Sequence, residues 1–238
     1  MENTSNFRED MVRFVFWLFV YALVSNIFIP LSEAISVPNS LTAIAYLLLC
    51  GIVIFVLYKK GKLKYYGFRS LHSLNYRKLL FCIPMIIIAS VNLWSGIHIN
   101  DTWIQIILVS VCMLCVGFIE ELLFRSFLVK ALMNKSEALA IIVSGSIFGF
   151  IHLLNIFTGA DLFSTLLQVL YAMSFGFMCA IFFCRTNNII PCVLCHSIGN
   201  VFDTFLPAEQ SLSMQYFGCG AIIIIAGFYS VYLLKRRK

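Results

Sequence analysis

The chain has 238 residues, of which 61% are hydrophobic and only 12% are charged. A soluble globular protein carries roughly 25% charged residues, so this composition excludes an ordinary soluble domain and indicates a chain surrounded mostly by lipid. The net charge of +6 does not indicate nucleic-acid binding, because the charges only separate apolar runs. Nine cysteines lie almost entirely inside those runs and are interpreted as small hydrophobic residues.

Apolar runs long enough to span a bilayer follow one another along the chain. A span needs about 20 residues. The runs predict about eight membrane-spanning helices, at residues 11–30, 39–58, 77–97, 102–132, 138–157, 162–184, 188–206 and 215–234. We therefore expect an all-α, polytopic transmembrane bundle that forms a single membrane domain over residues 1–238. Pro84 lies inside a run, where it predicts a kink.

The basic residues predict the orientation of the chain. With a cytoplasmic N-terminus and eight spans, all 17 lysines and arginines fall on the cytoplasmic side, apart from Arg125 inside the fourth span. The outer loops then carry acidic residues only, namely Glu33, Asp101, Asp161 and Glu209. This positive-inside pattern predicts a multi-pass protein of the cell membrane with cytoplasmic N- and C-termini.

The fourth run carries a cluster of charged residues. Ionisable side chains inside a span cost about 2.5–3.5 kcal/mol each and usually mark function. Glu121 and Arg125 are four residues apart and share a helix face, with the acid first, which is the better order for an ion pair. Glu120 points about 100° away, so its unpaired carboxylate could act as a general base. The alternative is a charged helix end at the cytoplasmic surface.

Polar residues also recur in the fifth and seventh runs. Phe148 and His152 lie one turn apart, and Asn155 is placed to be a partner of His152, which could equally be a hydrogen-bonded structural residue. His196, Asn200 and Asp203 follow at i, i+4 and i+7, so they form one polar stripe on an apolar helix. The alternative for this stripe is hydrogen bonding between helices.

Three of these residues fall in the middle portions of their spans. Glu120, His152 and His196 could therefore bring a carboxylate and two imidazoles together at mid-membrane. Such a set can activate water or bind a divalent metal such as zinc. The ligands would come from three separate helices with no compact zinc motif, which favours an arrangement without tightly bound zinc.

Together the motifs resemble the CPBP/Abi family of intramembrane endopeptidases, the family of CAAX prenyl endopeptidases of type II and of bacteriocin-processing proteins. The matching patterns are Glu-Glu-x-x-x-Arg at 120–125, Phe-x-x-x-His at 148–152 and His-x-x-x-Asn at 196–200. The resemblance places a family-like catalytic core at about 102–206. It implies hydrolysis of a peptide bond in a membrane-associated peptide or protein.

The resemblance also implies a role for each matched residue. Glu120 would activate water with the help of His152, while His196 and Asn200 would stabilise the oxyanion. The supporting residues are Glu121, Arg125 and Phe148. A glutamate-dependent mechanism and a metallo-endopeptidase mechanism both stay open, because Glu120, His152 and His196 could instead be metal ligands.

The substrate and the biological role are less closely defined. Prenylated substrates are a eukaryotic feature, whereas this compact chain favours a bacterial source, in which family members are linked to bacteriocin maturation, self-immunity or the processing of signalling peptides. A catalytically idle immunity or scaffold protein on the same fold is the alternative, although the intact motifs argue against it. A transporter that uses Glu120 as a proton site would favour repeated halves, and none is found.

Overall fold

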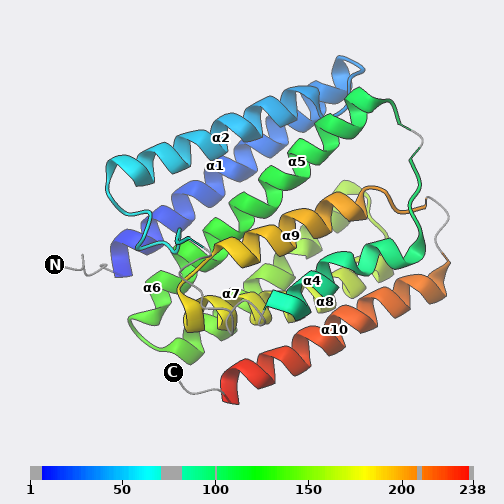
Figure 1. The fold of residues 1–238 in the computed structure, drawn as a ribbon. Coiled ribbons are helices and arrows are strands. Elements are labelled where there is room, and N and C mark those ends of the chain that lie inside the picture. The colour runs from blue at the N-terminus through cyan, green and yellow to red at the C-terminus, as the bar shows by residue number, and fades with distance from the viewer. Residues whose placement is uncertain (1–6, 71–81, 100, 208–210, 236–238) are drawn as a thin grey trace.

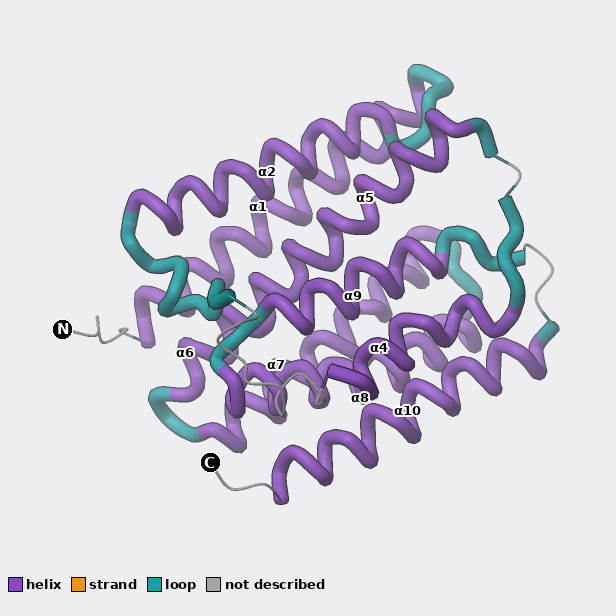
Figure 2. The backbone as a smooth tube through the Cα atoms, in the orientation of Figure 1, coloured by secondary structure: helices purple, strands orange, loops and turns teal. Residues whose placement is uncertain are grey.

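The computed structural model describes residues 7–70, 82–99, 101–207 and 211–235. Within these residues every regular element is a helix, and loops join the helices (Figure 2). The predicted all-α bundle is therefore confirmed. Six helices are long and apolar enough to cross a membrane, which identifies a multi-pass membrane protein.

The helical stretches follow the order of the predicted spans. The long ones are α1 (Phe7–Ala34), α2 (Ser40–Lys59), α5 (Trp103–Glu121) continued by η4 (Leu122–Val129) and α6 (Lys130–Met133), α7 (Glu137–Phe150) continued by η5 (Ile151–Thr158), α8 (Leu162–Thr186) and α10 (Leu212–Lys235). The short ones are α4 (Ile83–Ser90) continued by η3 (Val91–Ser95), and α9 (Ile190–Asp203). Eight stretches thus match the eight predicted runs within the described residues, but two fall short of a full span.

The helices pack into one bundle in which α9 lies between α5 and α4 (Figure 1). The pair α1 and α2 packs against the stretch from α5 to η4, and α8 packs against both α7 and α10. The N- and C-terminal ends of the described chain lie at the same end of the bundle (Figure 1). The short helix α9 is therefore flanked by the long helix α5 on one side and by the short helix α4 on the other.

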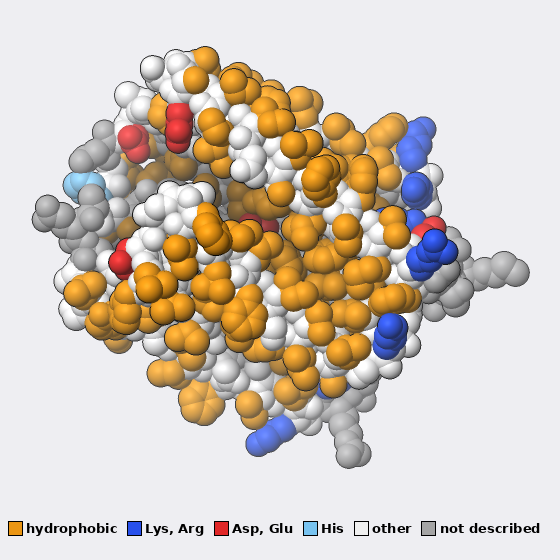
Figure 3. Space-filling view, turned by 180° about the vertical axis from the view of Figure 1, so that it is seen from behind, with side chains coloured by type: hydrophobic (Ala, Val, Ile, Leu, Met, Phe, Trp, Pro, Cys, Tyr) orange, Lys and Arg blue, Asp and Glu red, His pale blue; other side chains and the backbone are white. Residues whose placement is uncertain are grey.

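The outer surface of the bundle is suited to lipid. Large apolar side chains on the outer helices are exposed, such as Phe19 on α1, Leu48 on α2 and Phe228 on α10. In Figure 3 apolar side chains cover the middle of the visible face, and the visible lysines and arginines gather toward one end. Because apolar side chains meet hydrocarbon without loss, this exposure is expected of a membrane protein.

One sequence prediction about the backbone was wrong. Pro84 lies in the first turn of the described helix α4, not in the interior of a helix. A proline in this position leaves no helical hydrogen bond unmade, because the first N–H groups of a helix have no partner within it. The kink predicted at Pro84 is therefore absent from the described helix.

A close contact fixes α9 against α5. A Cβ atom at Gly117 would lie 2.5–2.7 Å from three atoms of Ser197, two of them backbone atoms. The Ser197 hydroxyl donates a hydrogen bond to the carbonyl of Leu114 at 3.0 Å. Only glycine allows this approach, and the contact brings the end of α5 beside the middle of α9.

The helices α7 and α8 also approach closely through glycine. A Cβ at Gly149 would lie 2.7 Å from the Cβ of Met173, and one at Gly145 would lie 2.3 Å from the ring of Phe177. Small residues allow transmembrane helices to approach in this way. The contact sets the position of Phe148, which lies between these two glycines in the sequence.

Candidate active site

The first motif lies where the long helix changes its winding. Glu120 and Glu121 are the last residues of α5, and the following stretch η4 is a π-helix whose eight side chains are all buried. π-helical turns are rare and are frequent at functional sites. No pattern in the sequence predicts this change of winding.

Glu121 and Arg125 form a fully buried ion pair, as their spacing predicted. Arg125 Nε lies 3.0 Å from Glu121 Oε2, and Nη2 lies 3.2 Å from Oε1. The guanidinium also donates to the hydroxyl of Ser144 at 2.9 Å and lies 4.6 Å from the ring centroid of Phe148. Because both side chains are 0% exposed, each charge depends on the other for compensation.

His196 lies between the two acids. Its Nδ1 is 3.1 Å from Glu121 Oε1. A carboxylate held by an arginine can only accept, so Nδ1 carries the proton of this hydrogen bond. The rings of Phe148 and Phe175, at 5.5 and 5.3 Å between centroids, pack against the imidazole and fix its plane. Nε2 of His196 then lies 3.7 Å from Oε2 of Glu120.

Glu120 has a different environment from Glu121. Its side chain is 20% exposed, and its Oε1 accepts a hydrogen bond from the hydroxyl of Tyr21 at 3.1 Å. Tyr21 belongs to α1 and lies 99 positions earlier in the chain, so no spacing in the sequence connects it with the site. The structure therefore divides the two acids, with one ion-paired and the other held by a tyrosine.

The second motif lies at the junction of α7 and η5. His152 Nδ1 is 2.8 Å from the carbonyl of Phe148, which can only accept, so Nδ1 carries the proton of this hydrogen bond. The Phe148 ring contacts both imidazoles, with centroids 5.5 Å from each. Asn155 donates to Gln168 at 2.9 Å. The prediction that Asn155 is the partner of His152 was therefore wrong.

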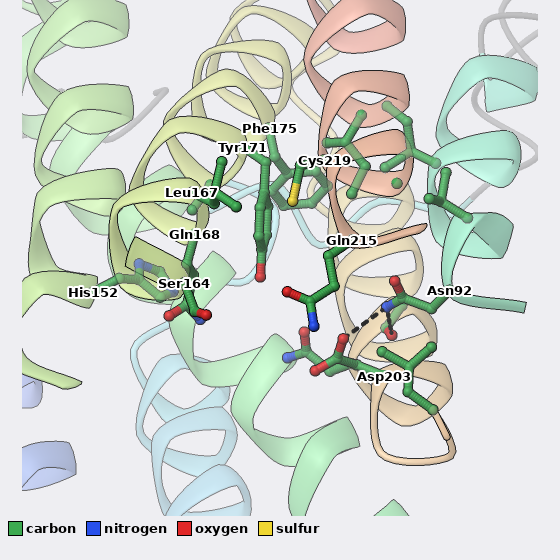
Figure 4. Close-up of a pocket in the computed structure, with 18 of the residues that line it drawn as sticks. Asn92, His152, Ser164, Leu167, Gln168, Tyr171, Phe175, Asp203, Gln215 and Cys219 are labelled. Carbon is green, nitrogen blue, oxygen red and sulfur yellow. Dashed lines mark hydrogen bonds between the residues drawn. The ribbon is translucent and has the colours of Figure 1, made fainter. Parts of the chain in front are cut away.

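A cavity of 340 Å³ reaches this cluster (Figure 4). His152, His196 and Asn200 contribute to its wall, whereas Glu120 does not line it and meets His196 from the side of α1. Within the described residues the side-chain amide of Asn200 has no hydrogen-bond partner, so it is available to a ligand. The cavity thus joins residues of the second and third motifs.

A metal ion fits these residues poorly. Among the described residues, the one group of three histidine, cysteine or carboxylate ligand atoms within 4.8 Å of one another is Glu121, Cys179 and Cys192. The Glu121 carboxylate in this group is already occupied by Arg125 and His196. The set of Glu120, His152 and His196 does not meet the same distance limit.

The arrangement has the parts of a hydrolytic site. A partly exposed carboxylate faces the imidazole of His196, whose other nitrogen is held by a buried acid. This order resembles the general scheme in which an acid orients a histidine that acts on the substrate. A second imidazole and an amide with no described partner lie in the adjoining cavity.

Comparison with known proteins gives a family match over the part of the chain that contains the motifs. Residues 102–202 match the family model described as Type II CAAX prenyl endopeptidase Rce1-like, and this segment contains all three motifs. No curated protein and no solved structure matches the chain. The matched family is one of endopeptidases, so a peptide hydrolase is indicated. Residues 102–202 are thus similar to the Rce1-like family of type II CAAX prenyl endopeptidases, the resemblance that the three motifs predicted.

Proposed function

We propose that the protein is an intramembrane endopeptidase that uses Glu120 to activate the water that attacks a peptide bond. The observation that carries this proposal is the gap of 3.7 Å between Glu120 Oε2 and His196 Nε2. It is too long for a direct hydrogen bond, but a single water molecule about 2.8 Å from each atom would contact both. Such a water lies against a base on one side and an imidazole on the other.

In this mechanism Glu120 carries a proton from the attacking water to the leaving amine. Its carboxylate takes a proton from the water as the oxygen attacks the carbonyl carbon, and the resulting carboxylic acid returns the proton to the leaving amine when the C–N bond breaks. The hydroxyl of Tyr21 holds Oε1 of this carboxylate and leaves Oε2 to face the water. Nε2 of His152 has no hydrogen-bond partner among the described residues, so it is available to orient water from the cavity.

The oxyanion of the tetrahedral intermediate is stabilised from α9. The buried carboxylate of Glu121 holds the imidazole of His196 through Nδ1, so that an Nε2–H of this ring can donate to the oxyanion. Asn200 lies one helical turn further along α9 and lines the same cavity, so its amide supplies a second donor. Each donor of this kind contributes about 10²–10³ in rate.

The same contacts support a glutamate-dependent route over a metal-dependent one. Three hydrogen bonds from Arg125 and His196 engage both oxygens of Glu121, and a carboxylate held in this way is a poor ligand for a zinc ion. Glu120 is suited to act as a base, because its carboxylate is partly exposed. Among the described residues, no lysine or arginine forms an ion pair with it.

The substrate is a membrane-associated peptide or protein. We place the basic end of the bundle in the cytoplasm of a bacterial cell, following the positive-inside rule. The cavity then opens toward the outer leaflet, because several residues of its wall lie at the helix ends opposite that basic end, including Ser95, Ala160 and Leu206. This orientation supports processing of a secreted or surface-bound peptide, such as a bacteriocin-like precursor, over a prenylated cytoplasmic CAAX protein.

The test uses the purified protein in lipid nanodiscs and a peptide library prepared from digested bacterial membrane proteins. Mass spectrometry of the products identifies the peptide bonds that are cleaved. We expect cleavage by the wild type and by Glu33→Gln, an exposed acid of α1 that does not line the cavity, but not by Glu120→Gln or His196→Ala. Undiminished cleavage by both site variants, or none by the wild type, would reject the proposal and favour an idle scaffold.

A further inference from the structure

One carboxylate in the cavity has no part in the proposed chemistry. Asp203 ends α9, is exposed and lines the cavity. Its Oδ1 accepts a hydrogen bond from the amide of Asn92 at 3.1 Å, and the same amide donates to the carbonyl of Gly199 at 3.3 Å. Among the described residues, no hydrogen bond or ion pair involves Oδ2. One oxygen of Asp203 is thus fixed to the wall, and the other remains available.

Among the described residues of the cavity wall, no lysine or arginine compensates the charge of Asp203. The described residues that line the cavity include no lysine or arginine, and none forms an ion pair with Asp203. In Figure 4 the side chains of Tyr171 and Gln215 point toward the same space as Asp203. A carboxylate among neutral polar groups and an aromatic ring is a suitable site for a cation, through charge and through cation–π contact.

A further acid, Asp161, adds to the negative field of this cavity. Asp161 caps the first turn of α8 by accepting from the backbone N–H of Ser164 at 2.8 Å, and Ser164 is itself part of the cavity wall. The backbone hydrogen bonds lower the pKa of Asp161, so it stays ionised at neutral pH. Acids gathered at the mouth of a cleft raise the local concentration of cationic ligands.

We propose that Asp203 forms a subsite that binds an ammonium or guanidinium group of the peptide substrate. The inference deepens the proposed function, because it assigns a substrate class to the same cavity. Asp203 lies seven residues beyond His196 on α9, which is about 10 Å along a helix. An extended peptide covers that distance in about three residues. The preferred substrates therefore carry a basic residue, or a free N-terminal amine, within about three residues of the cleaved bond.

The first test measures binding without cleavage. The protein carries Glu120→Gln, and the probes are acetylated and amidated leucine-rich hexapeptides that differ at one position, lysine or norleucine. We expect the lysine peptide to bind about tenfold tighter than the norleucine peptide when Asp203 is present, and equally when it is replaced by asparagine. Asp203→Glu keeps the charge and should keep most of the preference, while Glu33→Gln is the control for a distant acid.

A second arm separates the two sources of the cation. A norleucine peptide with a free N-terminus tests the amine, and the acetylated lysine peptide tests the side chain. A preference for either one that depends on Asp203 supports the subsite. Equal binding of charged and neutral probes, or a preference that persists in Asp203→Asn, would overturn the inference.

The cleavage assay then distinguishes this inference from the proposed function. Products of the wild type should be enriched in basic residues near the cleaved bond, and Asp203→Asn should lose that enrichment through a higher KM with little change in kcat. Cleavage without enrichment rejects the subsite and leaves the peptidase standing. Binding that depends on Asp203, in a protein that cleaves nothing, rejects the peptidase and leaves the subsite.

Discussion

Replacing Arg125 by methionine should strongly destabilise the bundle. The guanidinium makes two hydrogen bonds to Glu121 and one to Ser144, and it packs on the ring of Phe148. Methionine fills part of the space but leaves the Glu121 carboxylate buried without a cation. Breaking a buried pair in this way typically costs about 3–5 kcal/mol. We expect a loss in this range.

The double variant tests whether the unpaired charge is the cause. Glu121→Gln removes the charge that Arg125→Met leaves behind, so the pair of changes should recover about 2 kcal/mol or more relative to Arg125→Met alone. The recovery should not restore activity, because the double variant lacks the carboxylate that holds Nδ1 of His196. Stability and cleavage should therefore separate in the double variant.

These differences in unfolding free energy are measured by equilibrium unfolding of the purified protein in mixed micelles. The micelles are titrated with sodium dodecyl sulfate, and unfolding is followed by circular dichroism. The matched control is Arg185→Met, since Arg185 pairs with Glu137 at 3.1 Å but both side chains are partly exposed. That change should lose less than about 1 kcal/mol. Two results would contradict this reasoning. Arg125→Met could lose no more unfolding free energy than Arg185→Met, or the double variant could be as unstable as the sum of the single changes. In either case the uncompensated charge of Glu121 is not the cause of the instability.

Three further changes probe the site, the helix packing and the basic end of the bundle. Tyr21→Phe removes the hydrogen bond to Glu120 and should lower kcat about tenfold, measured on any peptide that the wild type cleaves, with unchanged far-ultraviolet circular dichroism. Gly117→Ala forces a Cβ into the backbone of α9 and should cost about 1–3 kcal/mol in the same unfolding assay, whereas Gly227→Ala meets open space and should be neutral or stabilising. Burial and a hydrogen bond to a buried aspartate of α1 raise the pKa of Tyr66. The stabilisation by Tyr66 is therefore complete below a pH of about 10 and is lost as the pH rises toward the folded-state pKa. Tyr66→Phe should flatten this alkaline decline in a pH series of unfolding titrations.

The order and type of the helices could be predicted because lipid imposes a simple rule on the sequence. A span must satisfy its backbone hydrogen bonds internally and present apolar side chains, so each helix leaves a run of recognisable length. The rule is weakest for α4 and α9, whose described lengths are 8 and 14 residues. The length of the apolar runs did not predict that these two helices would fall short of a full span within the described residues.

Within the site, local pairs could be predicted and distant ones could not. The Glu121–Arg125 pair depends on helical spacing alone, and the polar stripe on α9 depends on the same periodicity. The hydrogen bond from Tyr21 to Glu120 depends on how α1 packs against the rest of the bundle, for which the sequence holds no periodic signal. The π-helical winding of η4 is also a product of packing, since all eight of its side chains are buried among neighbouring helices.

The placement of the polar residues follows from the same packing. A helix that crosses the bilayer in contact with lipid cannot carry a row such as His196, Asn200 and Asp203 without a large free-energy cost. α9 carries this row because it lies between α5 and α4, with a cavity along its polar side. The Gly117 contact holds one flank of α9 against α5, and the polar side of α9 borders the cavity. A short, shielded and partly polar helix is therefore the element on which a membrane protein can assemble a hydrolytic site, and the features that make α9 a weak span are those that make it suitable for catalysis.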